Sequence, residues 1–294
     1  MSRSSDYDVC CGLENLPVSI ESTSHEEQLP RFQYSPDNVP GPGSDIDPSE
    51  VTFPGCDCNS ASCHPGICSC LQSHGQMYND TLCLRVQDEK DSGCCRPVFE
   101  CNIMCRCSEA CANRVVQRGL GFRLQVFRTE GKGWGLQTLE PVPKGRFVCE
   151  YAGEVIGFAE ACSRQRSQKL GDMNYIIAVR EHASGGGRVV ETFIDPARVG
   201  NIGRFLNHSC QPNLLMVPVR VDSLVPRLAL FAARDIALGE ELVYDYSGSY
   251  KNSRCESQVV IISNTDSLSK KPCYCGAKEC SRFLPLDVSI INHI

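Results

Sequence analysis

Several features are absent from this sequence, and each absence excludes a class of protein. Apolar runs such as Leu228–Ala233 are far shorter than the about 20 apolar residues that span a bilayer. No block of five or more lysines and arginines occurs, so the sequence does not support direct binding to the phosphates of DNA. The first ten residues have neither a basic nor an apolar stretch, so we expect no signal peptide and a reducing, intracellular compartment.

An excess of positive charge is also missing, since the 294 residues carry a net charge of −6. A mildly acidic protein is better suited to a basic partner, so we expect a cationic peptide tail as the partner. Hydrophobic residues make up 41% of the chain, which is enough to bury a core.

Cysteine, in contrast, is abundant, with 21 residues. Two interpretations compete, a disulfide framework and metal sites. The odd count, the lack of a secretion signal and the tight C-x-C pairs favour metal. A disulfide-rich secreted binding protein is the alternative, and a metal assay that finds no zinc would favour it.

The composition changes along the chain and divides it into five segments. We expect a tail and lead-in with little structure of its own at 1–50, a cysteine-rich module at 51–115, a globular domain at 116–248, a flexible linker at 249–272 and a second cysteine segment at 273–289. Apolar periodicity is nearly absent from 51–115, so metal must supply the stability of that module.

The globular segment contains mostly the short apolar runs that are typical of strands, which predicts a mainly β fold. One helix is predicted at Phe158–Lys169. The predicted strands are Phe122–Arg128, Arg146–Tyr151, Met173–Arg180, Val189–Asp195, Leu214–Val221, Leu228–Ala233 and Glu241–Tyr246.

Nine cysteines of the first module have the spacing of zinc ligands. They can fill two tetrahedral sites with one thiolate left over, or three sites if three sulfurs each bridge two ions, because three zincs need twelve ligand contacts. The spacing alone leaves both arrangements open. The nine are Cys56, Cys58, Cys63, Cys68, Cys70, Cys101, Cys105, Cys107 and Cys111. Cys83, Cys94 and Cys95 lie between the two groups, and we interpret them as loop residues.

Four segments of the globular domain have the residue types of a site, although each alone has an ordinary structural explanation. GKGWG at Gly131–Gly135 is a turn that lets backbone approach a ligand, but Leu136 does not fit a dinucleotide fingerprint. RFLNHSCQPN at Arg204–Asn213 is rich in polar groups. EELVYDY ends at Tyr246, and strand alternation places Tyr244 on the same face. The fourth segment is a strand that contains Asn-Tyr-Ile, residues 174–176.

Taken together and in this order, the four segments resemble the SET-domain family of protein-lysine methyltransferases. CDCNSASCHPGICSC and ECNIMCRCSEACANRVVQ resemble the family's pre-SET module, which implies a three-zinc cluster bridged by the nine cysteines. The resemblance covers residues 31–285 and implies small twisted sheets with a C-terminal pseudoknot. Flanking text such as ETFIDPARVGNIGRFLNHSC is closest to the branch that in some species is fused to a mariner transposase. No transposase sequence is present, so no activity on DNA is carried over.

The same resemblance implies a cofactor, S-adenosylmethionine, and roles for individual residues. Tyr246 is expected to be the main orienting hydroxyl, Tyr175 a second wall of the lysine channel, and Tyr244 the residue that limits the number of methyl groups added. The expected catalytic set is Tyr246, Tyr175, Tyr244 and Asn207. The expected cofactor set is Lys132, Gly133, Trp134, Tyr175, Arg204, Asn207 and His208.

A second metal site is expected near the C-terminus. Cys273, Cys275 and Cys280 are one ligand short of a tetrahedral zinc. The resemblance implies that Cys210 completes this post-SET site, which ties the segment to the knot and brings the expected total to four zincs. The alternative is a separate site completed by Cys255.

The sequence therefore predicts an S-adenosylmethionine-dependent protein-lysine methyltransferase in the nucleus, on chromatin. Its expected substrate is a lysine of the histone H3 tail or another basic peptide, with mainly mono- and dimethyl products. The alternative is a catalytically silent SET domain that acts as a zinc-stabilised interaction module. Binding of S-adenosylmethionine distinguishes the two.

Overall fold

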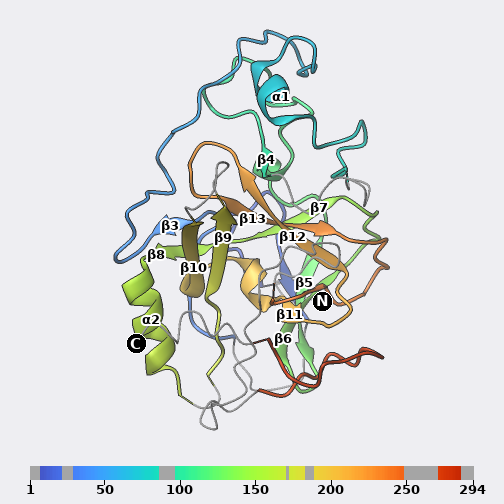
Figure 1. Cartoon of the computed structure of the whole chain (residues 1–294). Helices are drawn as coiled ribbons and strands as arrows, with labels where there is room; N and C mark the ends of the chain where they lie inside the picture. The colour runs from blue at the N-terminus through green and yellow to red at the C-terminus, as the bar shows by residue number, and fades with distance from the viewer. Residues whose placement is uncertain are drawn as a thin grey trace.

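The computed structural model describes residues 7–21, 29–85, 97–169, 172–182, 189–247 and 271–285. Cys94, Cys95, Cys255 and residues 249–270 of the expected linker lie outside these ranges. Within them the chain is mainly β, as the sequence predicts (Figure 1). No helix in the described part of the chain has the length and apolar character needed to cross a membrane.

Four small sheets make up the fold. One has the order β1 (Ser19–Ile20), β5 (Leu124–Thr129) and β6 (Gly133–Thr138). A second has the order β2 (Gln33–Tyr34), β10 (Val189–Gly200), β8 (Gly153–Ile156) and β3 (Val39–Pro40), with β9 (Ile177–His182) also paired to β10. A third has the order β4 (Val98–Phe99), β12 (Leu214–Arg220), β13 (Arg227–Ala232) and β7 (Phe147–Tyr151). The fourth pairs β11 (Asn207–His208) with β14 (Val243–Tyr244).

The main core lies between these sheets. Every residue of β7 is buried, and β13 is buried after its first residue, because both strands lie in the middle of the molecule with apolar side chains at most positions. Strand β5 instead alternates buried and half-buried positions at its start, with Leu124 and Val126 facing the core. Leu136 of β6 and Val148, Cys149 and Tyr151 of β7 also belong to this core.

The N-terminal lead-in differs from the sequence expectation. Residues 1–50 were expected to have little structure of their own, yet Val9, Cys10 and Val18 are buried in the main core. Strands β1, β2 and β3 each pair in parallel with a strand of the globular domain. The polar composition hides this role, because a two-residue edge strand needs few apolar side chains.

Helices are few. Helix α2 (Phe158–Ser167) confirms the predicted helix and ends two residues early, where Gln168 adopts an extended backbone. Helix α1 (Ser69–His74) lies in the cysteine module at one end of the molecule (Figure 1). Two single-turn 3-10 helices, η1 (Val116–Arg118) and η2 (Ile202–Phe205), lead into β5 and β11.

Some strand boundaries were predicted wrongly. Strands β6 and β8 were not predicted, because their glycines weaken the strand pattern. The strand expected at Met173–Arg180 begins only at Ile177, so Tyr175 lies in the segment that precedes β9.

Candidate active site and zinc centres

The site is built around two chain segments, distant in the sequence, that pair side by side. Strands β11 and β14 pair in parallel, with Asn207 opposite Val243 and His208 opposite Tyr244. Beyond the strands, the Ser209 amide donates to the Tyr244 carbonyl at 3.0 Å. This pairing brings together RFLNHSCQPN and EELVYDY, as the expected pseudoknot requires.

Asn207 connects the knot to the glycine turn. Its side-chain Nδ2 donates to the Trp134 carbonyl at 3.1 Å and to Glu241 Oε1 at 3.0 Å. Lys132 reaches the same carboxylate, with Nζ 2.5 Å from Glu241 Oε2. Lys132, Trp134 and Asn207, three of the predicted cofactor residues, therefore lie in one hydrogen-bonded group. Glycine at 133 fits the turn, since its φ of +81° is unfavourable for other residues.

The His208 imidazole is used by the protein itself. Its Nδ1 accepts a hydrogen bond from the Tyr246 amide at 3.2 Å, so Nε2 carries the proton and faces Cys210 Sγ at 3.4 Å. Burial lowers the pKa of His208, and the nearby Asp245 carboxylate opposes that shift. The ring is therefore neutral near pH 7, and only the backbone of His208 is free to meet a ligand.

The predicted tyrosines gather beside the knot. The rings of Tyr244 and Tyr246 have centroids 4.9 Å apart, and Tyr151 packs edge-on against Tyr244 at 6.2 Å. The Tyr246 hydroxyl donates to the Leu206 carbonyl at 2.9 Å. The Tyr151 hydroxyl donates to the Tyr175 carbonyl at 2.6 Å, which fixes the segment before β9 against this aromatic group.

Burial raises the pKa of Tyr246, and the neighbouring Tyr175 acts in the same direction. Burial also raises the pKa of Tyr244 well above its ordinary value. Both hydroxyls are therefore protonated at neutral pH, and they can orient a nitrogen but cannot act as bases.

Arg204 packs against two aromatic rings. Its guanidinium carbon is 4.2 Å from the Phe32 ring centroid and 4.9 Å from that of Tyr175. Its Nε donates to the Pro196 carbonyl at 3.2 Å. The side chain thus packs against the ring of Tyr175, another of the predicted cofactor residues.

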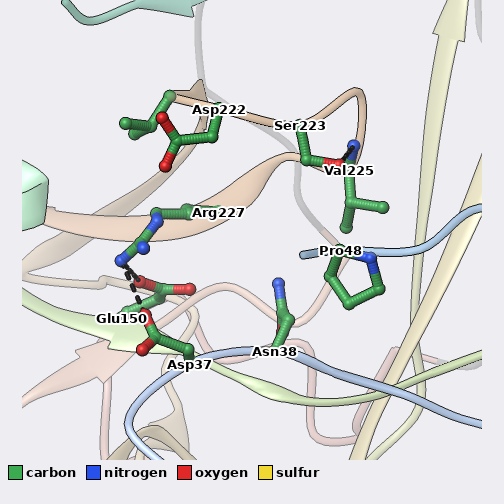
Figure 2. Close-up of a pocket in the computed structure, with 9 residues that line it drawn as sticks. Asp37, Asn38, Pro48, Glu150, Asp222, Ser223, Val225 and Arg227 are labelled. Atoms are coloured by element: carbon green, nitrogen blue, oxygen red, sulfur yellow. Dashed lines mark hydrogen bonds and ion pairs between the residues drawn. The ribbon is translucent and has the colours of Figure 1, made fainter. Parts of the chain in front are cut away.

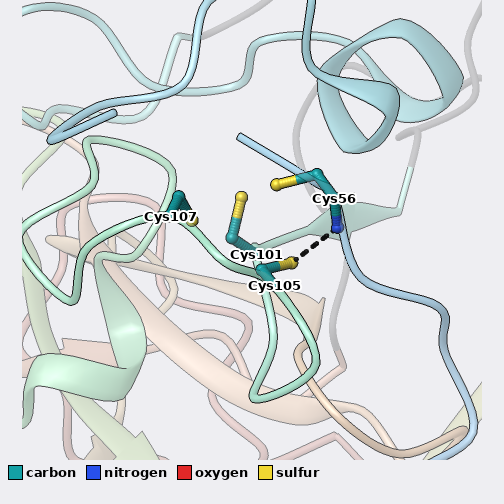
Figure 3. A group of neighbouring side chains, drawn as sticks. All are labelled: Cys56, Cys101, Cys105 and Cys107. Atoms are coloured by element: carbon teal, nitrogen blue, oxygen red, sulfur yellow. Dashed lines mark hydrogen bonds between the residues drawn. The ribbon is translucent and has the colours of Figure 1, made fainter. Parts of the chain in front are cut away.

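The nine cysteines of the first module come together in space, and each belongs to at least one group of four whose sulfurs lie within 4.8 Å of one another. One such group, Cys56, Cys101, Cys105 and Cys107, is drawn in Figure 3. Cys56 and Cys101 each occur in three of the four overlapping groups, so each of these sulfurs lies within reach of more than one metal position. The arrangement supports the bridged cluster over two separate sites.

The sulfur separations fit zinc and are too long for disulfides between the neighbouring cysteines of the cluster. Four sulfurs about 2.3 Å from a tetrahedral zinc lie about 3.8 Å apart. Cys56 and Cys63 have their sulfurs 3.7 Å apart, as do Cys63 and Cys101. A disulfide needs about 2.05 Å. Backbone amides also donate to the sulfurs, for example from Cys63 to Cys111 at 3.3 Å, which favours thiolates.

The second cysteine group is Cys210, Cys273, Cys275 and Cys280, again with all sulfurs within 4.8 Å. The set fits a closed four-thiolate zinc site, with Cys210 as the fourth ligand as the resemblance implied. The site sits directly on the knot, because Cys210 follows Asn207 by three residues. Cys83 belongs to none of the groups found among the described residues.

A small pocket lies elsewhere, where the lead-in meets β7 and β13 (Figure 2). Arg227 Nη1 is 2.9 Å from Asp37 Oδ1 and 3.3 Å from Glu150 Oε2. Glu150 Oε1 is buried and has no partner among the described residues. Burial raises the pKa of Glu150 to about 7, and the Arg227 guanidinium opposes the shift. The pocket is a structural junction without the residues of the knot.

Two residues of the site were not singled out in the sequence. Glu241 stands inside EELVYDY, and its role depends on pairing with a turn more than a hundred residues earlier. Tyr151 lies in a buried strand, where a tyrosine usually has only a packing role. For both residues, the only signal in the sequence is a polar side chain next to hydrophobic residues.

Comparisons with known proteins agree with this geometry. Residues 133–247 match the family model described as the SET domain, and residues 10–114 match the Pre-SET motif. The mouse histone-lysine N-methyltransferase SETMAR is 59% identical over 284 residues, which cover 96% of this chain and 90% of the mouse protein. This similarity confirms the branch predicted from the flanking segments.

Solved structures give the same result. The crystal structure of the methyltransferase domain of human histone-lysine N-methyltransferase SETMAR has a TM-score of 0.83 and 54% identity, over 97% of this chain and 99% of that chain. A crystal structure of KRYPTONITE in complex with mCHH DNA, an H3(1-15) peptide and SAH has a TM-score of 0.69 and 28% identity, over 95% of this chain and 53% of that chain.

Proposed function

Because the chain belongs to the SET-domain family of histone-lysine N-methyltransferases, we propose that it transfers methyl groups from S-adenosylmethionine to a lysine of the histone H3 tail. The observation that carries the proposal is the parallel pairing of β11 with β14, beside which Asn207 bonds to Trp134 and Tyr246 bonds to Leu206. The H3 peptide and SAH in the KRYPTONITE structure support the choice of substrate and cofactor.

The proposed cofactor residues offer complementary groups. S-adenosylmethionine brings an electrophilic methyl group on a sulfonium, together with an α-ammonium and a carboxylate. Both Nδ2 hydrogens of Asn207 are used within the protein, so its Oδ1 is left to accept from an ammonium. The Lys132–Trp134 turn offers backbone groups, and we assign the backbone of His208 to the same ligand.

The proposed channel residues align the reacting amine. A lysine has a pKa of about 10.4, so forming its neutral amine at pH 7 costs roughly 4.6 kcal/mol. A channel lined by Tyr175, Tyr244 and Tyr246 excludes water, which disfavours the charged ammonium. The Tyr246 hydroxyl donates to Leu206, so its lone pairs are free to accept an N–H bond from the lysine. Alignment of this kind supplies much of the rate of a displacement reaction.

Zinc has a structural role in this proposal. The nine cysteines of the first module and Cys210, Cys273, Cys275 and Cys280 would hold four ions. Closed thiolate sites leave no open position for substrate. Arg204 acts by supporting the Tyr175 ring rather than by touching the cofactor. The protein would act in the nucleus, where histone tails are found, and the net charge of −6 suits such a basic partner.

The test is mass spectrometry of histone octamers after incubation with the purified protein and S-adenosylmethionine. We expect methyl groups on one or a few lysines of H3, mostly as mono- and dimethyl forms. Binding of the cofactor without any transfer to octamers or basic peptides would instead favour the silent interaction module.

A further inference from the structure

We infer that Glu241 is a positioning residue of the cofactor site, because its carboxylate sets the orientation of the Asn207 side-chain amide. The inference rests on the proposed function and adds a residue to it. Glu241 itself is not expected to touch the cofactor. It acts by keeping Oδ1 of Asn207 turned toward the cofactor.

The contacts of Asn207 define the orientation. An amide nitrogen has two hydrogens, and here one faces the Trp134 carbonyl at 3.1 Å while the other faces Glu241 Oε1 at 3.0 Å. The oxygen Oδ1 is then on the open side, and none of the described residues donates to it. An acceptor on that side suits a cationic ammonium.

The reverse orientation is unfavourable only while both acceptors are present. A rotated amide would place its oxygen against the Trp134 carbonyl and the Glu241 carboxylate, so that oxygens face each other. The Trp134 carbonyl is neutral, whereas Glu241 contributes a charged acceptor and hence the stronger hydrogen bond. Removing the Glu241 acceptor therefore leaves the amide free to present either atom.

The structure holds Glu241 firmly in this position. The Leu242 amide donates to the Leu136 carbonyl at 2.7 Å, and Glu241 forms an isolated antiparallel β-bridge with Gln137. These contacts fix the backbone of Glu241 to β6. A Cβ atom at Gly135 would lie 3.2 Å from Glu241 Oε1, so glycine leaves the space that the carboxylate occupies. The Glu241 side chain is 24% exposed, which limits screening by water.

Lys132 offers a competing explanation, because Glu241 also neutralises its ammonium. An unpaired Lys132 would repel a cationic cofactor, and that alone would weaken binding. The two explanations separate in a Lys132→Met background, where only the Asn207 contact remains. In that background Glu241→Gln keeps an oxygen acceptor, whereas Glu241→Met has the same length and no acceptor.

The experiment measures the dissociation constant of S-adenosylhomocysteine by titration calorimetry on zinc-loaded protein. In the Lys132→Met background, Glu241→Met is expected to bind about 10- to 100-fold more weakly, the range for losing a hydrogen bond to a charged group. Glu241→Gln should stay within about threefold of that background, since it retains a neutral acceptor. Glu240→Gln is the matched control, because Glu240 bonds to Asn213 and Arg234 and not to Asn207.

Equal affinities for the Glu241→Met and Glu241→Gln proteins would overturn the inference. A Glu241→Met protein with a reduced kcat and an unchanged KM for S-adenosylmethionine would also overturn it, since the orientation of a binding group acts on KM. Glu241→Ala replaces Glu241→Met if the latter loses zinc. Failure of the unsubstituted protein to bind S-adenosylhomocysteine would refute the proposed function instead.

Discussion

At the scale of single residues, the two halves of the knot have different chemistry. Asn207 is fully engaged through its nitrogen and offers only an acceptor, while Tyr246 offers the lone pairs of a hydroxyl. In the proposed roles, the Asn207 acceptor holds the cofactor equally well in the ground state and the transition state. The Tyr246 hydroxyl would instead align the amine, which matters most in the transition state.

This difference predicts separate kinetic effects for two substitutions. Asn207→Ala should weaken S-adenosylmethionine binding about 10- to 100-fold, because a hydrogen bond to a charged group is lost. Tyr246→Phe should lower kcat about 100-fold with little change in KM, because the amine is misaligned. Steady-state kinetics on an H3 peptide, with zinc content as the control, would check both. Rates like those of the unsubstituted enzyme in either variant would contradict the assignment.

Tyr244 leads to a prediction about products. Its ring is packed between Tyr151 and Tyr246, and the side chain is 5% exposed. A methylated lysine has to place its methyl groups in the same space, and burying a methyl against a hydroxyl costs about 1–3 kcal/mol. Tyr244→Phe should therefore shift the products of an H3 peptide toward trimethyllysine, as read by mass spectrometry. Abundant trimethyl product from the unsubstituted enzyme would contradict this role.

Glu150 predicts a pH dependence of stability. Its pKa in the folded protein is raised to about 7 by burial, so the folded state binds the proton more tightly than the unfolded state. The stability it contributes is complete below the ordinary pKa of 4.5 and is lost as the pH rises toward 7. The glutamine of Glu150→Gln cannot ionise. The free energy of unfolding of this variant, relative to the unsubstituted protein, should therefore rise by about 1 kcal/mol between pH 6 and pH 8.

Urea unfolding at the two pH values would measure this gain, with zinc content verified at each. Glu50→Gln, which removes an exposed carboxyl, is the control. A constant difference between the Glu150→Gln and unsubstituted proteins across this range would show that the carboxyl does not titrate there, which contradicts the raised pKa.

At the scale of elements, the sequence predicts the features that depend on residues close together in the chain. Runs such as β13 and helix α2 show their periodicity directly, and C-x-C spacing identifies zinc ligands without any fold. Contacts between distant segments were not predictable from local patterns. The burial of Val9 and the Glu241–Asn207 contact both depend on pairings across the chain. The packing of Arg204 against Phe32 and Tyr175 has the same character, since both rings come from distant segments.

The post-SET segment shows how one element completes the site. The ring of Tyr274 would lie 3.7 Å from a Cβ at Gly131, so this segment covers the glycine turn. Cys210 fixes the segment to the knot, where the His208 ring faces the same sulfur. Zinc at these cysteines therefore organises one side of the proposed cofactor site.

Cys275→Ser should accordingly remove one zinc of four and weaken S-adenosylhomocysteine binding about tenfold, because the segment is no longer held in place. Native mass spectrometry and calorimetry would measure the two effects. Cys83→Ser, which alters none of the cysteine groups, is the control. Loss of zinc without loss of affinity would show that the segment has no part in binding.

At the scale of the whole molecule, two different forces stabilise its two ends. The SET sheets enclose an apolar core that extends from Val9 to Tyr244. The buried cluster of the cysteine module contains nine cysteines and Leu71, of which Cys70 is only partly buried. A cluster without other apolar side chains gains little from leaving water, so metal coordination must hold it together.

We therefore predict that chelation of zinc unfolds the cysteine module and leaves the SET core folded. The native protein should contain four zincs, and a structural zinc contributes on the order of 10 kcal/mol to folding. After chelation, hydrogen exchange should become fast at Cys56–Cys70 and Cys101–Cys111. Amides of β7 and β13 should stay protected, because their core contains no metal ligand. Hydrogen-exchange mass spectrometry would follow both regions in one sample. Two or fewer zincs in a fully active protein would contradict the four-ion arrangement, and equal loss of protection everywhere would show that the SET core depends on the cluster.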